Sequence, residues 1–271
     1  MPELPEVETT RRGIAPHVVG KTITAVDVRE RRLRWPIAKN FASRLTGAPV
    51  LQVQRRAKYL LFELPQGYFM LHLGMSGSLR VADADEALRK HDHLVITLSC
   101  GRQLRFNDPR RFGSALWLGE RPQQHALLCS LGPEPFDQHL APDYLFMQSR
   151  KRKVAVKNFV MDNHVLVGVG NIYANEALFM SGIRPRRAAG RVSRDEYERL
   201  LANIRMVLSD SIKMGGSTLR DFVGGDGMPG YFQQTLRVYG RAGQACNVCA
   251  ATIKQVTVGQ RSSFYCANCQ R

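Results

Sequence analysis

The sequence lacks an apolar run long enough to cross a membrane, and it has few acidic residues for its number of basic ones. No stretch of about 18 apolar residues occurs, so no membrane-spanning helix is predicted. The opening MPELPEVETTRRG has neither the charged and apolar regions of a secretion signal nor the composition of a transit peptide, and we expect a cytoplasmic protein. With 39 Lys and Arg against 23 Asp and Glu, the net charge of +16 favours a polyanionic partner, nucleic acid before an anionic membrane. A basic protein without an anionic partner is the alternative.

Cysteine is also scarce, and four of the six cysteines stand together near the end of the chain. Two Cys-x-x-Cys pairs, separated by 16 residues with strand-like composition, are typical of one tetrahedral Zn²⁺ site on a β-hairpin. Four thiolates leave no position for water, so a structural ion is expected. Scattered disulfides and a redox dithiol in a βαβ setting are not indicated. The predicted ligands are Cys246, Cys249, Cys266 and Cys269; Cys100 and Cys129 receive no role.

Hydrophobic periodicity divides the rest of the chain into a β part and a helical part. A short helix is predicted in the first 20 residues, and several strands between about 22 and 118 favour a β-sandwich or barrel. Ser193 and Glu196 form a predicted capping box before a helical run that ends at Gly215–Gly216. The expected fold is α+β and multi-domain. Its predicted parts are an N-terminal β-sandwich domain with a leading helix (1–130), a linker (131–150), a helical domain (151–230) and a zinc-finger hairpin (237–271).

Three polar segments are candidates for contact with nucleic acid, although each also has an ordinary structural explanation. The basic run 150–153, with Lys157, either meets phosphates or forms a solvated face. The glycines before Asn171 either open a helix that receives an anion or make a tight turn. The Arg-rich turn 108–113 either enters a groove or is a surface turn.

Longer motifs resemble the bacterial formamidopyrimidine-DNA glycosylase (Fpg) family over essentially the whole chain, in collinear order. The resemblance implies an N-terminal β-sandwich, a helix–two-turn–helix domain and a C-terminal zinc finger. The motifs that carry it are PELPEVET at 2–9, RRAKYL at 55–60, HLGMSG at 72–77, KHDH at 90–93, NDPRRFG at 107–113, LGPEP at 131–135, MDN at 161–163 with VGVGNIYANEALF at 167–179, and GQRSSFYC at 259–266.

The resemblance implies that the chain terminus itself is the nucleophile. After removal of Met1, Pro2 presents a secondary amine, and α-amino groups have a pKa of about 7.7–8, well below that of lysine. It would attack C1′ of a damaged nucleotide, expel the base and leave a Schiff base. Glu3 is the implied acid/base at the sugar, and Glu6 the second carboxylate. Without the resemblance, the residues favour a simpler interpretation, in which Pro2 is a signal for removal of Met1. Both glutamates are then ordinary charges in the first turn of a helix.

The remaining implied roles concern DNA. Lys58 and Arg261 match residues that act at the target nucleotide and its phosphates. Met75, Arg110 and Phe112 resemble the trio that fills the gap left by a flipped base. His91, Arg152 and Asn171 fall on other DNA-contact positions, and residues 217–232 have the glycine content of a lesion-covering loop.

The expected activity is therefore excision of oxidised purines, such as 8-oxoguanine and formamidopyrimidines, followed by strand cleavage at the abasic site by β- and δ-elimination. The expected enzyme is a monomer on damaged double-stranded DNA, nucleoid-associated, with one Zn²⁺ and no redox or nucleotide cofactor. Alternatives are the sister enzyme endonuclease VIII, which favours oxidised pyrimidines, a non-catalytic zinc-containing nucleic-acid binder, and a Mg²⁺-dependent nuclease. Leu4 argues against the sister enzyme, whose start usually reads P-E-G-P-E.

Overall fold

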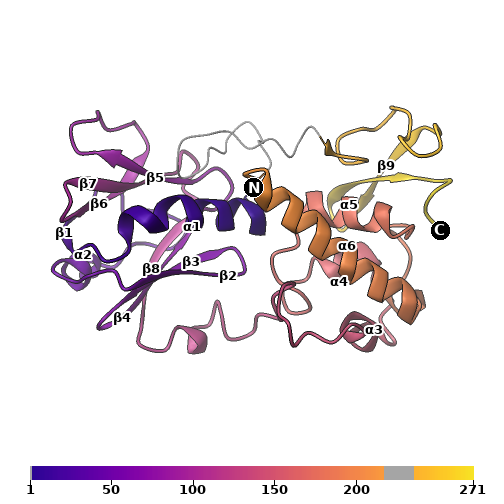
Figure 1. The fold of residues 1–271 in the computed structure, drawn as a ribbon, viewed down its shortest axis with the longest axis horizontal. Helices are drawn as coiled ribbons and strands as arrows, with labels where there is room; N and C mark the ends of the chain where they lie inside the picture. Colours follow the sequence, from indigo (N-terminus) through magenta and orange to yellow (C-terminus); the bar gives the residue numbers. More distant parts are fainter. Residues whose placement is uncertain (1, 217–234) are drawn as a thin grey trace. The chain divides into compact units, whose positions relative to one another are not determined.

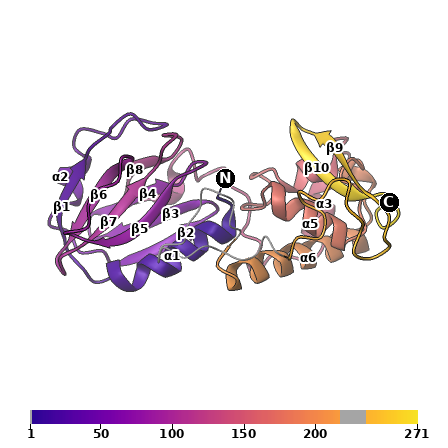
Figure 2. The same ribbon diagram turned by 90° about the horizontal axis from the view of Figure 1, so that it is seen from above.

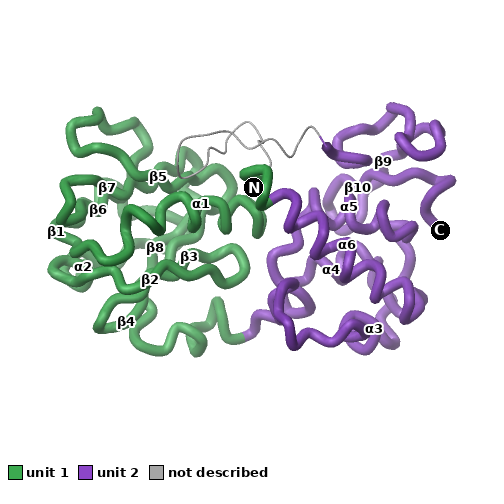
Figure 3. The backbone as a smooth tube through the Cα atoms, in the orientation of Figure 1, with its two compact units in different colours: residues 1–129, 212–231 green, residues 130–211, 232–271 purple. Residues whose placement is uncertain are grey.

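A computed structural model describes residues 2–216 and 235–271 of the chain. The chain forms two compact units, residues 1–129 with 212–231 and residues 130–211 with 232–271 (Figure 3). The predicted lesion-covering loop, 217–232, lies outside the described residues. No helix within the described part is long and apolar enough to span a membrane.

The first unit contains two four-stranded antiparallel sheets that share one apolar core (Figure 1). Phe62 and Phe69 stack between neighbouring strands with ring centroids 4.4 Å apart, and Phe41 meets Phe69 edge-on. The expected β-sandwich is confirmed. One sheet has the order β1 (Ile23–Val28), β6 (Asp92–Leu98), β7 (Arg102–Asn107), β5 (Ser78–Asp83), and the other β2 (Gln52–Arg56), β3 (Tyr59–Leu64), β4 (Gly67–His72), β8 (Ser114–Gly119).

The leading helix α1 (Leu4–Val18) is present as predicted and packs on β2, β5 and β3. The strand-like runs that predict the β part do not include β7, and no helix was expected at α2 (Phe41–Leu45). Strand β7 was not predicted because Leu104 and Phe106 are its only apolar residues, and Arg105 lies between them. That side chain is fully buried, and its guanidinium donates to the carbonyls of Asp83 and Glu86.

The second unit is mainly helical (Figure 2). The predicted capping box is confirmed: Glu196 N–H donates to Ser193 Oγ (3.3 Å), and Ser193 N–H donates to Glu196 Oε2 (2.8 Å). Its described elements are α3 (Tyr144–Ser149), α4 (Val156–Val160), α5 (Asn171–Met180), η2 (Ala189–Arg191), most of α6 (Arg194–Lys213), and the hairpin β9 (Ile253–Val258) and β10 (Arg261–Cys266). The short helix η1 (Pro122–Gln124) belongs to the first unit.

A buried charge network joins α1 to β2. The Glu8 carboxylate accepts hydrogen bonds from Arg11 (2.8 Å), Arg12 (2.8 Å) and Arg55 (3.3 Å). Burial alone would raise the pKa of Glu8, but the hydrogen bonds and charges of these arginines lower it to about 2.

Glu8 should therefore stabilise the fold in a pH-dependent way. Because its folded pKa lies below its ordinary value, this contribution is complete above about pH 4.5 and disappears as the pH falls towards 2. We expect Glu8→Gln to have a lower melting temperature than the parent at pH 6. The difference should shrink by pH 3 in paired thermal scans, and a constant difference would contradict the assignment.

Candidate catalytic and DNA-binding site

The chain terminus is held by a capping box at the start of α1. Glu3 N–H donates to Glu6 Oε2 (2.8 Å), and the Glu3 side chain accepts from the backbone of Glu6. Pro2, Glu3 and Glu6 are all buried. Glu6 thus fixes the backbone that immediately follows Pro2, and two carboxyl groups lie within one helical turn of Pro2.

Lys58 lies in the tight turn between β2 and β3, and α1 packs on both of these strands. The preceding Ala57 has φ +53°, a conformation that non-glycine residues avoid. Arg55 Nη1 donates to the Ala57 carbonyl (2.9 Å) while its Nε donates to Glu8. The Glu8 network therefore connects the helix that begins at the N-terminus to the turn that carries Lys58.

His72 is paired across the hairpin with Tyr59, the residue after Lys58. Burial, together with the positive charges of Lys58 and Arg34, lowers the pKa of His72 to about 4. The ring is therefore neutral at pH 7, and its Nδ1 accepts a hydrogen bond from Gly74 N–H (3.1 Å). This bond holds the start of the loop that carries Met75.

Met75, Arg110 and Phe112 come together at an exposed tip of the first unit. Met75 is 39% exposed and Phe112 42% exposed, high values for large apolar side chains. The Arg110 guanidinium lies 4.7 Å from the centre of the Phe112 ring. Two apolar groups and one cation thus project from neighbouring loops. His91 is close by, since its carbonyl accepts a hydrogen bond from Asp108 N–H (3.0 Å) at the start of the Arg110 turn.

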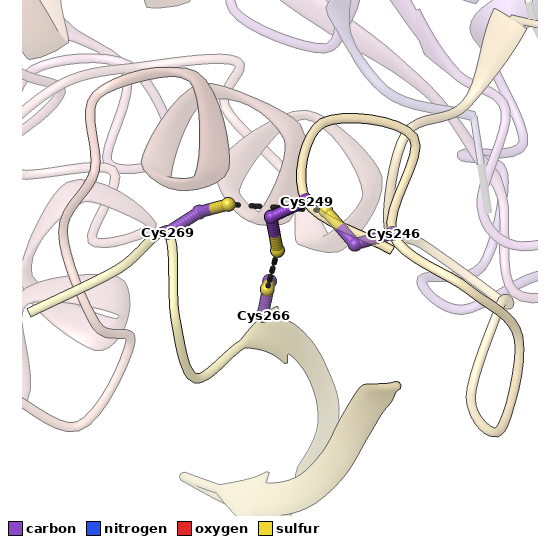
Figure 4. Close-up of side chains that lie close together, drawn as sticks. All are labelled: Cys246, Cys249, Cys266 and Cys269. Atoms are coloured by element: carbon purple, nitrogen blue, oxygen red, sulfur yellow. Dashed lines mark hydrogen bonds between the residues drawn. The ribbon is translucent and has the colours of Figure 1, made fainter. Parts of the chain in front are cut away.

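In the second unit the four predicted zinc ligands form one cluster (Figure 4). Their Sγ atoms all lie within 4.8 Å of one another, with Cys249–Cys266 at 3.4 Å and Cys246–Cys269 at 3.9 Å. A tetrahedral ion with Zn–S bonds of about 2.3 Å needs sulfur–sulfur distances of roughly 3.8 Å. The donor set and its dimensions therefore suit one structural Zn²⁺, and among the described residues it is the one cluster of three or more metal-ligating side chains.

Side chains from α4 and α5 fix the zinc hairpin at the residues next to Arg261. Lys157 Nζ donates to the Ser262 carbonyl (2.9 Å) and to Ser263 Oγ (2.6 Å). Asn171 Nδ2 donates to the same Ser262 carbonyl (3.2 Å), and Asn175 Oδ1 accepts from Phe264 N–H (2.7 Å). Arg261, at the exposed start of β10, is thus presented on a strand anchored to two helices.

Lys157 does not join the solvated basic run, contrary to the expectation from sequence. The residue is fully buried, so its ammonium serves the hairpin and not a phosphate. Arg152 in the same run is exposed. Asn171 takes part in the hairpin contact, and its Oδ1 is buried without a hydrogen-bond partner among the described residues.

Sequence reasoning assigned no role to Glu176, although it lies in a quoted motif. Its buried carboxylate accepts three backbone N–H bonds of 2.8–3.0 Å, from Arg237, Val238 and Tyr239. No pattern in the sequence connects residues 61 to 63 positions apart, so this contact could not be anticipated. It fixes the backbone where the described chain resumes before the zinc finger.

Substitution of Lys157 should affect the hairpin and not the electrostatics of DNA binding. In Lys157→Met we expect zinc to be released to a chelator several-fold faster, because Ser262 and Ser263 lose their common donor. The slope of log affinity against log salt should stay unchanged. Lys153→Met is the matched control at an exposed site, and it should reduce that slope by about one if the side chain meets a phosphate. The reverse pattern in the two variants would restore the phosphate assignment for Lys157.

Comparison with known proteins covers the whole chain. Residues 1–115 match the family model "Formamidopyrimidine-DNA glycosylase N-terminal domain", residues 131–223 match its "H2TH domain", and residues 243–271 match "Zinc finger found in FPG and IleRS". Formamidopyrimidine-DNA glycosylases of Thioalkalivibrio sulfidiphilus and Stutzerimonas stutzeri are 59% and 57% identical to it over the full length of both chains.

Solved structures give the same result. A Lactococcus lactis Fpg mutant in complex with Fapy-dG-containing DNA has a TM-score of 0.92 at 31% identity, with full coverage of both chains. MutM in complex with DNA containing carbocyclic 8-oxo-G has a TM-score of 0.91 at 32% identity, also with full coverage. From its sequence, its domains and its fold, the chain belongs to the formamidopyrimidine-DNA glycosylase family.

Proposed function

We propose that the protein is a bifunctional base-excision repair enzyme that removes oxidised purines from double-stranded DNA and then cleaves the strand. The observation that carries the proposal is the terminal Pro2–Glu3 pair, held by the capping box of α1 in a chain whose full-length relatives are formamidopyrimidine-DNA glycosylases. A protein that only binds DNA needs no amine at that position.

The chemistry follows from the amine of Pro2 once Met1 has been removed. Its low pKa leaves a neutral fraction near pH 7, and its lone pair attacks C1′ while the damaged base leaves with the C1′–N bond electrons. Loss of the amine proton and ring opening give an iminium between Pro2 and C1′. Removal of the acidified C2′ proton then expels the 3′-phosphate, and a second elimination expels the 5′-phosphate. Glu3 is the proposed carrier of protons at the sugar, and Glu6 positions the terminus.

Two groups of residues are proposed to bind the DNA. Lys58 acts beside the terminus at the target nucleotide, and Met75, Arg110 and Phe112 fill the space left by the flipped base, with Arg110 donating to the unpaired cytosine. His91, Arg152, Asn171 and Arg261 contact the DNA backbone, and the single Zn²⁺ keeps the hairpin of Arg261 folded.

The proposed domains are residues 1–130, the linker 131–150, residues 151–230 and residues 237–271. The proposed enzyme is a monomer that acts on chromosomal DNA in a bacterial cytoplasm.

The test is a comparison of substrates under single-turnover conditions. We expect fast excision and nicking of duplexes with 8-oxoguanine or formamidopyrimidine opposite cytosine, and no reaction with undamaged DNA. Nicking should survive a brief exposure to EDTA, which would abolish a Mg²⁺-dependent nuclease. A thymine-glycol duplex tests the alternative substrate class, because one Lactococcus lactis Fpg structure contains oxidised-pyrimidine DNA. Preference for thymine glycol would overturn the purine assignment, and tight binding without excision would overturn the enzyme assignment.

A further inference from the structure

The exposed tip of the first unit is built from two loops that approach unusually closely. One loop, 73–77, carries Met75, and the other, 108–113, carries Arg110 and Phe112. A Cβ added at Gly74 would lie 2.5 Å from the carbonyl carbon of Phe112 and from the nitrogen of Gly113, and Gly74 also has φ +68°. Backbone therefore packs on backbone here, and the two loops have little room to move independently.

The side chain of Asp108 connects these two loops. Its Oδ1 accepts a hydrogen bond from Ser76 Oγ (3.2 Å) in the Met75 loop, and its Oδ2 accepts one from Gly113 N–H (2.7 Å) next to Phe112. Asp108 is completely buried, so these bonds are shielded from water and the carboxylate depends on them.

The backbone of Asp108 extends the connection to His93 in β6 and to His91, which immediately precedes that strand. His93 Nε2 lies 2.9 Å from the Asp108 carbonyl, which also accepts from Arg111 N–H (3.1 Å), and Asp108 N–H donates to the His91 carbonyl. Four proposed DNA-contact residues, namely Met75, His91, Arg110 and Phe112, are therefore tied to one buried residue that makes no contact with DNA in the proposed mechanism.

We propose that Asp108 is a positioning residue, which holds Met75, Arg110 and Phe112 as one preformed wedge through its bonds to Ser76 and Gly113. The proposal rests on the proposed function of the tip in filling the space left by a flipped base. Three side chains that must enter one gap in the base stack lose less conformational freedom on binding when their relative positions are fixed beforehand. Asp108 then contributes to excision from duplex DNA and to recognition of the opposite base, but not to chemistry at an abasic site that is already exposed.

Two buried serines provide a matched pair of variants. Ser76 donates to Asp108, whereas Ser114 Oγ is buried without a partner among the described residues. We expect Ser76→Ala to excise 8-oxoguanine opposite cytosine roughly tenfold more slowly in single-turnover assays, because a hydrogen bond to a buried carboxylate is lost. The ratio of excision rates opposite cytosine and opposite adenine should fall towards one. Ser114→Ala should behave as the parent protein, and cleavage of a preformed abasic site in single-stranded DNA should be equal in all three.

Asp108 itself gives the second pair. Asp108→Asn should retain most of the duplex activity, because its amide oxygen can accept from Gly113 N–H while its NH₂ donates to Ser76 Oγ. Asp108→Ala should lose roughly a hundredfold on the duplex and keep the single-stranded abasic activity.

Equal duplex rates for Ser76→Ala and Ser114→Ala would overturn the proposal. So would a loss by Ser76→Ala that is just as large on single-stranded abasic DNA, since it would show a general structural defect. Failure of the proposed function would appear differently, as absence of excision in the parent protein and in Ser114→Ala.

Discussion

Protein in which Met1 is retained should form no covalent adduct with lesion-containing DNA when borohydride is added. The Pro2 nitrogen is then part of a tertiary amide, whose lone pair is delocalised and which has no proton to lose, so it can neither attack C1′ nor form an iminium. Because the nucleophile is lost and not merely weakened, we expect excision of 8-oxoguanine to fall by roughly a thousandfold or more. Single-turnover rates of Met1-retaining protein and of the same chain beginning at Pro2 measure the effect.

Binding provides the control for this experiment. The charged and apolar groups proposed to contact DNA lie elsewhere in the chain, so affinity for a duplex with an uncleavable abasic-site analogue should stay within a few-fold of the parent. An adduct at the normal rate in Met1-retaining protein would place the nucleophile on a lysine, with Lys58 the first residue to examine, and would refute the assignment to Pro2.

Loss of one zinc ligand should have the next largest effect. In Cys266→Ser we expect the zinc content to fall from one ion per chain to near zero, because the cluster loses one of four thiolates from a site worth many kcal/mol to folding. The hairpin core, which includes Cys266, Phe264 and Ile253, should lose its order, and Arg261 is then no longer presented on a fixed strand. We expect DNA affinity to fall by at least tenfold.

Cys129→Ser is the matched control, since this exposed cysteine lies outside the zinc cluster. It should keep one zinc ion and full DNA affinity. Metal analysis together with anisotropy titrations separates the two variants. Unchanged zinc content and affinity in Cys266→Ser would reject the four-cysteine site.

Sequence patterns predicted those parts of the fold that depend on local spacing. The helix at the N-terminus, the Ser193–Glu196 capping box and the zinc hairpin are all formed by residues close together in sequence, and all three are present. Strand β7 was missed because Arg105 stands among its few apolar residues. That arginine is buried, and besides Gln103 of the same strand its partners include the carbonyls of Asp83 and Glu86, about 20 residues away. The residues next to Arg105 in the sequence do not indicate that such distant carbonyls will accept its hydrogen bonds.

For the candidate site as well, contacts between residues far apart in the sequence could not be predicted. The roles of Pro2, Glu3 and Arg261 came from resemblance to a family, since an N-terminal proline or an arginine in a hairpin is unremarkable by itself. Lys157 belonged to a basic run by sequence, yet tertiary packing buries it against residues more than 100 positions later. Asp108 was seen only as part of an Arg-rich turn, because its connection to Ser76 exists only once the two loops have packed together.

The central claim is that the terminal amine of Pro2 attacks the damaged nucleotide. The most direct test is borohydride trapping on a duplex with 8-oxoguanine opposite cytosine, followed by proteolysis and mass-spectrometric mapping of the modified peptide. We expect a single adduct, located on the nitrogen of Pro2 in chains that have lost Met1. An adduct on any lysine, or no adduct from Pro2-initiated protein that binds the same duplex tightly, would contradict it.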